Sequence, residues 1–158
     1  KSIIKNLPPW LAISKIKFDN KNSFELDNGS WVKASSTSGD AGRSEALSLL
    51  VIDEAAHVEN IGEMWAGLYP TLSTGGSCIA LSTPNGIGNW FHQTWVKAET
   101  NENLFNPIKL HWTVHPERDN SWREEQEKQL GPKGAAQECD CDFVSSGDTV
   151  IPSEVLIK

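Results

Sequence analysis

The sequence predicts an α/β fold with a mainly parallel sheet, flanking helices and a β-hairpin region near the start. Residues 49–52 and 78–81 are continuous apolar runs, which is typical of strands covered on both faces in a parallel sheet. Between them, apolar residues recur at helical spacing from Ile61 to Leu68, and Pro70 follows. Parallel strands need a crossover connection, so this order predicts a βαβ unit.

The opening third of the chain is predicted to be rich in β-strands. Residues 14–18 and 23–26 alternate polar and apolar side chains, and residues 31–34 form a third short run. Between the second and third runs stands Asp27-Asn28-Gly29-Ser30, a strong tight-turn signal. It also contains a glycosylation sequon, but no secretory signal precedes it, so the turn is favoured.

Weaker patterns predict the later elements. Residues 108–114 resemble another strand, and residues 121–130 form a charged helix that ends at Gly131. Asp140 and Asp142 would share one face of a strand at a sheet edge.

Composition places the chain among ordinary water-soluble proteins of one compact domain. It has 158 residues, of which 38% are hydrophobic and 22% charged. The net charge of −7 has the wrong sign for nucleic-acid binding through bulk charge, so any DNA contact must be local or shared with other chains. Three cysteines without a CxxC pair favour a reducing compartment, and no apolar run is long enough to cross a membrane. Because the chain does not begin with Met, we expect a piece of a longer protein.

Two adjacent acids, Asp53 and Glu54, follow the first apolar run directly. Ligands of open α/β sheets bind at the carboxyl ends of the strands, so both carboxylates are delivered to the expected site. This is the form of a Walker B motif, in which Asp53 would hold Mg²⁺, usually through water, and Glu54 would orient the water that attacks a γ-phosphate. The alternative is an acidic helix start that meets the positive end of the helix dipole.

Hydroxyl and amide side chains follow the second run, in Ser82-Thr83-Pro84-Asn85-Gly86. If the two strands are neighbours, this loop lies where it can sense a γ-phosphate and couple hydrolysis to movement. A plain turn is the alternative, since Pro, Asn and Gly favour turns without any ligand.

An ordered set of motifs runs through nearly the whole chain: residues 23–30, Gly42-Arg43-Ser44, residues 50–56, residues 82–86 with Trp90-Phe91, His111-Trp112, Cys141-Asp142-Phe143 and Ile151-Pro152. With this set the sequence resembles the ATPase domain of the large terminase subunit, the DNA-packaging motor of tailed double-stranded DNA phages. The resemblance implies a P-loop NTPase-like fold and an ATPase that uses ATP and Mg²⁺ to move DNA into a procapsid. It implies double-stranded DNA, a portal protein, a small terminase subunit and a homo-oligomeric ring as partners in the host cell cytoplasm, and no membrane.

The resemblance also assigns residues. Asp53 matches the Mg²⁺ ligand and Glu54 the catalytic glutamate, while Ser82, Thr83 and Asn85 lie in the coupling motif that faces the nucleotide. Arg43 lies in the stretch where the family has an arginine proposed to reach the phosphates of a neighbouring subunit. A solvated pairing of Arg43 with Asp40 or Glu45 is the alternative.

A phosphate-binding loop of the form G-x-x-x-x-G-K-[ST] does not occur in the sequence. We therefore expect residues 1–144 to be the later part of a terminase ATPase domain without its Walker A part, and residues 145–158 to be a linker towards a nuclease domain that this chain lacks. The complete protein would be the ATPase, and this chain alone inactive.

Three other interpretations remain. Another P-loop motor, such as a superfamily 2 helicase, also places acids after an apolar strand, and a non-catalytic assembly domain could keep the fold without the activity. A zinc module is disfavoured, because residues four apart on a strand lie too far from each other to share one ion. It would use His111, His115, Cys139 and Cys141.

The seven tryptophans are expected in the core rather than on a base-stacking surface.

Overall fold

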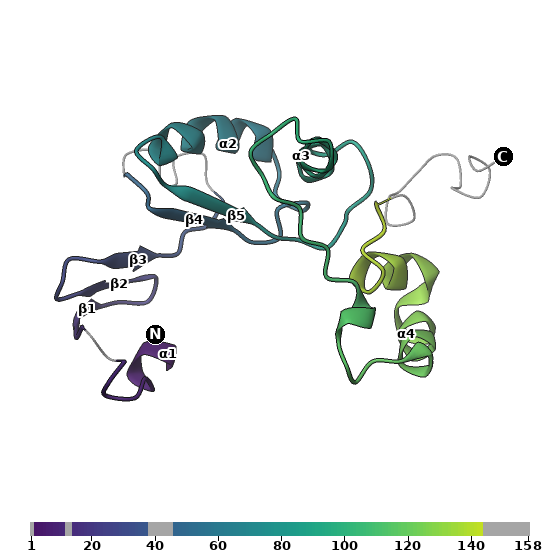
Figure 1. The fold of residues 1–158 in the computed structure, drawn as a ribbon, viewed down its shortest axis with the longest axis horizontal. Coiled ribbons are helices and arrows are strands. Elements are labelled where there is room, and N and C mark those ends of the chain that lie inside the picture. The colour runs from purple at the N-terminus through teal and green to yellow at the C-terminus, as the bar shows by residue number, and fades with distance from the viewer. Residues whose placement is uncertain (1, 12–13, 38–45, 144–158) are drawn as a thin grey trace. The chain divides into compact units, whose positions relative to one another are not determined.

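The computed structural model describes residues 2–11, 14–37 and 46–143 (Figure 1). The chain divides into two compact units, residues 1–42 and residues 43–158.

The first unit contains a short helix, α1 (Ser2–Lys5), and a three-stranded antiparallel sheet in the order β1-β2-β3. The strands are β1 (Ile16–Asp19), β2 (Ser23–Leu26) and β3 (Trp31–Lys33). Gly29 adopts φ +86° in the turn between β2 and β3, a conformation that glycine reaches without the steric cost of a side chain. The predicted β-hairpin region is confirmed.

The second unit begins with the predicted βαβ arrangement. Strand β4 (Leu49–Ile52) pairs in parallel with β5 (Ser77–Ala80), with Leu49 opposite Ser77 and Ile52 opposite Ala80. The crossover consists of helix α2 (Ile61–Leu68) and a 3₁₀ turn, η1 (Tyr69–Leu72). Pro70 lies in the first turn of η1, where its missing N–H leaves no hydrogen bond unmade.

Only one face of the β4–β5 sheet is covered by described residues. Leu50 and Ile52 face a core that includes Ile61 of α2 and Phe91 of α3 (Trp90–Glu99), and Figure 1 shows α2 over this face. On the opposite face Leu49, Val51 and Ile79 are 53%, 54% and 51% exposed. The expectation of strands covered on both faces is therefore wrong for the described residues, because alternate side chains of a strand point to opposite faces and no described helix covers the second face.

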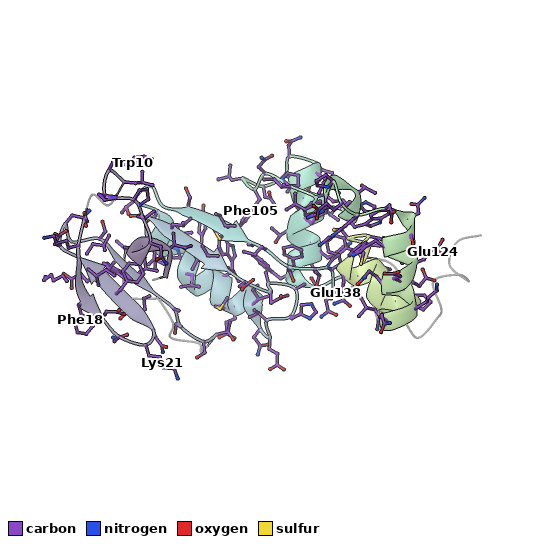
Figure 2. The ribbon with its side chains drawn as sticks, turned by 90° about the horizontal axis from the view of Figure 1, so that it is seen from below. Trp10, Phe18, Lys21, Phe105, Glu124 and Glu138 are labelled. Carbon is purple, nitrogen blue, oxygen red and sulfur yellow. The ribbon has the colours of Figure 1, made fainter. Side chains whose placement is uncertain are left out.

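An aromatic cluster joins α2 to α3. The ring of Trp65 lies 5.5 Å from that of Tyr69 and 5.6 Å from those of Trp90 and Phe105, the last of which is labelled in Figure 2. The expected core role of tryptophan is confirmed for Trp65 and Trp90, which are half-buried. It is wrong for Trp10 and Trp31 in the first unit, which are 79% and 43% exposed.

The strand expected at residues 108–114 is not formed. Its place is taken by an irregular segment and a 3₁₀ turn, η2 (Trp112–Val114). Ile108 and Leu110 are 69% and 70% exposed, and within the described chain no strand pairs with this segment. An apolar run becomes a strand only when a neighbour takes up its backbone hydrogen bonds.

Helix α4 (Asn120–Glu138) confirms the predicted charged helix and extends beyond it. Asp119 caps its start by accepting a hydrogen bond from the Trp122 N–H at 2.8 Å. Gly131, at φ 72° and ψ 168°, interrupts the helical backbone as the sequence predicted, and a second helical segment, which was not expected, follows it. Asp140 lies in the turn after α4 and Asp142 also lies outside any strand, so the sheet-edge prediction for this pair is wrong.

Candidate functional site

The two polar segments expected at the site do lie side by side. The parallel ladder continues past β4 and β5, because the Leu81 N–H donates to Ile52 O and the Ala55 N–H donates to Leu81 O, both at 3.0 Å. These bonds place the residues after β4 next to Ser82, the first polar residue after β5. The structure thus brings Asp53, Glu54 and Ser82 to one edge of the sheet, as parallel strands require.

Asp53 and Glu54 are exposed and begin a tight turn rather than a helix. Glu54 has φ +52°, a left-handed conformation that residues other than glycine seldom adopt. The turn closes with the His57 N–H donating to Glu54 O at 2.8 Å, while the Glu54 N–H donates to Asp53 Oδ1 at 3.1 Å. Because α2 begins only at Ile61, the acidic-helix-start alternative is wrong.

Side chains from the loop after β5 hold this turn. Ser82 Oγ accepts a hydrogen bond from the Ala56 N–H at 3.1 Å. Asn85 Nδ2 donates to Ala56 O at 3.2 Å. Both backbone polar groups of Ala56 therefore bind side chains of the loop that sequence analysis assigned to coupling.

The same loop is anchored on the first turn of α3 by Asn89. Asn89 Oδ1 accepts from the His92 N–H at 2.9 Å, which caps the helix, and Nδ2 donates to Asn85 O at 2.8 Å and to Gly86 O at 3.3 Å. Asn89 was not among the residues expected at this site. An Asn directly before the apolar start of a helix is a cap signal that could have identified it.

Thr83 points elsewhere. Its hydroxyl donates to Glu138 Oε1 at 3.3 Å, at the end of α4, where Figure 2 labels Glu138. Within one short loop, Ser82 and Asn85 bind the turn after β4 while Thr83 binds the last helix. Glu138 had no assigned role in the sequence.

Arg43, Asp40 and Glu45 lie outside the described residues, so the expectations for them stay untested. So do those for residues 145–158, which include Ile151-Pro152.

The donor set at the end of β4 fits Mg²⁺ chemically. Mg²⁺ prefers carboxylate oxygens and is commonly bound through one or two carboxylates together with substrate phosphates and water. Asp53 and Glu54 are exposed, and among the described residues neither forms an ion pair. Asp53 Oδ1 accepts from the neighbouring Glu54 N–H, and within the described ranges no hydrogen bond is formed by Oδ2.

Two kinds of feature are absent from the described part of the chain. No group of three or more His, Cys, Asp or Glu side chains lies close enough to hold a metal ion by itself, and this includes the histidines and cysteines of the zinc interpretation. Nor do the described helices include one with the length and apolar character that a membrane span requires.

The sequence matches the model of a known protein family over most of its length. The model described as "Terminase large subunit, T4likevirus-type, N-terminal" matches residues 2–156.

Proposed function

The chain belongs to the T4-like family of terminase large subunits, the phage DNA-packaging terminases, and on that premise we propose that it is part of a motor that couples ATP hydrolysis to DNA translocation. The observation that carries this proposal is the juxtaposition of Asp53-Glu54 with Ser82 at one edge of the parallel sheet. In open α/β sheets, that edge is where nucleotides bind.

The two carboxylates divide the chemistry between them. Asp53 would hold Mg²⁺, usually through water, and the ion would neutralise charge on the phosphates. Glu54, whose backbone is left-handed, would accept a hydrogen bond from the attacking water and orient it towards the γ-phosphate. Ser82 and Asn85 bind the turn after β4 from the neighbouring loop, and Thr83, which binds Glu138 in this structure, would couple the nucleotide to movement as part of the same loop. The P-loop NTPase-like fold is part of the proposal, and the described β4–α2–β5 unit supports it.

The partners follow from this function. They are double-stranded DNA, a portal protein, a small terminase subunit and further copies of the chain in a ring, in the cytoplasm of the host cell. Since the net charge is −7, DNA contacts of the motor would rely on local basic groups or on other chains. Arg43 would serve as an arginine that reaches a neighbouring subunit's nucleotide. The family match disfavours a superfamily 2 helicase, and the experiment below tests a non-catalytic assembly domain.

Substitution Glu54→Gln in the complete terminase large subunit tests the proposal. Loss of a positioned general base typically lowers a rate by about 10²–10⁴-fold, so kcat for ATP should fall by at least about 100-fold. The Kd for Mg·ATP should stay within about threefold, since Asp53 is retained. Glu59→Gln, a substitution of the same type at an exposed position just beyond the turn, is the matched control. Normal turnover by Glu54→Gln, or no turnover by the unsubstituted protein, would overturn the proposal.

A further inference from the structure

Ala56 is held in an unusual way for a residue in a tight turn. Its side chain is only 7% exposed, and both its N–H and its C=O bind side chains of residues 26 and 29 positions later in the chain. A backbone group removed from water needs a partner, and here the partners are Ser82 Oγ and Asn85 Nδ2. Removing either side chain leaves one of these backbone groups without its bond.

The turn that contains Ala56 also contains a strained residue. Glu54 has φ +52°, which a residue with a Cβ adopts at a cost in free energy. Such a conformation persists when the surroundings over-determine it. The surroundings here are the bonds of Ala55 N–H to Leu81 O and of Ala56 to Ser82 and Asn85.

The loop that carries Ser82 and Asn85 is also held where it meets α3. Asn89 binds the carbonyl of Asn85 and caps α3, so the loop between β5 and α3 has hydrogen bonds on both sides. Because Ser82 and Asn85 bind Ala56, a displacement of this loop relative to β4 would also displace the turn that carries Glu54.

We propose that Ser82 and Asn85 are positioning residues for Glu54, which act by holding the backbone of Ala56. This inference rests on the proposed function and deepens it, because it assigns these side chains to the placement of the water-orienting carboxylate and not to affinity for the nucleotide. The Ser82 hydroxyl oxygen accepts from the Ala56 N–H, and the Asn85 amide nitrogen donates to the Ala56 carbonyl oxygen.

Kinetics of the complete protein separate positioning from phosphate binding. A displacement of a catalytic group by about 1 Å can cost about 100-fold in rate. Ser82→Ala and Asn85→Ala, which lacks the donor and adds no charge, should each lower kcat by about 10- to 100-fold. The Kd for Mg·ATP should stay within about twofold. Ser82→Thr keeps the hydroxyl and should restore most of kcat, and Ser73→Ala, at an exposed position before β5, is the control.

A second measurement needs no nucleotide. In the nucleotide-free complete protein, Ser82→Ala should speed hydrogen exchange at the Ala56 amide at least tenfold, because that N–H loses its acceptor, and Ser82→Thr should reverse the change.

A double substitution provides a third measurement. In a Glu54→Gln background, Ser82→Ala should lower the residual rate of ATP hydrolysis by less than about twofold, since the carboxylate that Ser82 positions is already absent.

The outcomes distinguish the two proposals. Suppose that the unsubstituted protein turns over ATP normally. If kcat is then unchanged in Ser82→Ala, or if that variant has a tenfold higher Kd for Mg·ATP at constant kcat, the positioning role alone is overturned. Unchanged exchange at Ala56 would do the same. An unsubstituted protein without ATP turnover would overturn the proposed function and this inference together.

Discussion

Arg123 and Asp140 form a bidentate ion pair across the kink of α4. Arg123 Nε lies 2.8 Å from Asp140 Oδ1, and Nη2 lies 2.6 Å from Oδ2. Arg123 also contacts Glu127 at 3.0 Å within the helix, and His111 Nε2 lies 3.8 Å from Asp140 Oδ1. The pair connects the first segment of α4 to the turn after Glu138, so it fixes the path of the chain around Gly131.

The first prediction concerns acid stability. The hydrogen bonds from Arg123 hold the pKa of Asp140 below its ordinary value of 3.8. A carboxyl whose pKa is lowered by folding stabilises the protein fully above the unfolded-state pKa, and this stability is lost as the pH falls through the folded-state pKa. Asp140→Asn should therefore lower the free energy of unfolding by about 1–3 kcal/mol at pH 6. The difference in unfolding free energy between the variant and the unsubstituted protein should disappear as the pH falls below 3.8. Urea unfolding between pH 2 and pH 7 measures this.

Glu124→Gln, at an exposed position of the same helix, serves as the control for that series. If the difference in unfolding free energy between Asp140→Asn and the unsubstituted protein stays constant down to pH 2, the ion pair does not stabilise the fold.

A second prediction concerns Asn89. An N-cap replacement by Ala typically costs about 1 kcal/mol, and here the Nδ2 donor to the carbonyls of Asn85 and Gly86 is lost as well. Asn89→Ala should therefore lower the free energy of unfolding by about 1–2 kcal/mol. Asn89→Asp keeps the capping oxygen and should lose less. Chemical denaturation compares these variants with Asn106→Ala, an exposed control, and equal stabilities of Asn89→Ala and the control would contradict the prediction.

Cysteine reactivity supplies a third prediction. Burial against the helices raises the pKa of the Cys78 thiol from 9.0 to about 11. The thiolate is the reactive form, so at pH 8 a shift of this size lowers its fraction by about 100-fold. Alkylation of Cys78 by iodoacetamide can be followed site by site with mass spectrometry. Its rate in the native protein should be about 100-fold lower than in the urea-unfolded protein, where the thiol reacts like a free cysteine. Equal rates in both conditions would exclude the buried placement.

The fourth prediction concerns the 158-residue chain as it stands. Nucleotide affinity in P-loop proteins depends on a lysine and backbone amides of the phosphate loop, and this sequence contains no such loop. Asp53 and Glu54 alone present negative charge to a negatively charged ligand. Calorimetric titration of Mg·ATP into the chain should give no measurable binding, whereas a micromolar Kd would reveal a phosphate site that the sequence analysis failed to identify.

Local patterns in the sequence were enough to predict the antiparallel strands, the β4–α2–β5 crossover and the first segment of α4. Periodicity and turn residues determine these elements, because each depends on neighbours a few positions away. The placement of Asp53 and Glu54 at the end of β4 was predictable for the same reason. Their chemistry with ATP and Mg²⁺ stays a proposal.

Tertiary structure decided what local patterns could not. Residues 108–114 have strand composition but no neighbouring strand among the described residues, so they form an irregular segment with a 3₁₀ turn. Asp140 is held by Arg123 and not by a sheet edge, which depends on the kink at Gly131. The hydrogen bonds from Ser82 and Asn85 to Ala56 join residues that are far apart in sequence, and only the parallel register of β4 and β5 brings them within reach.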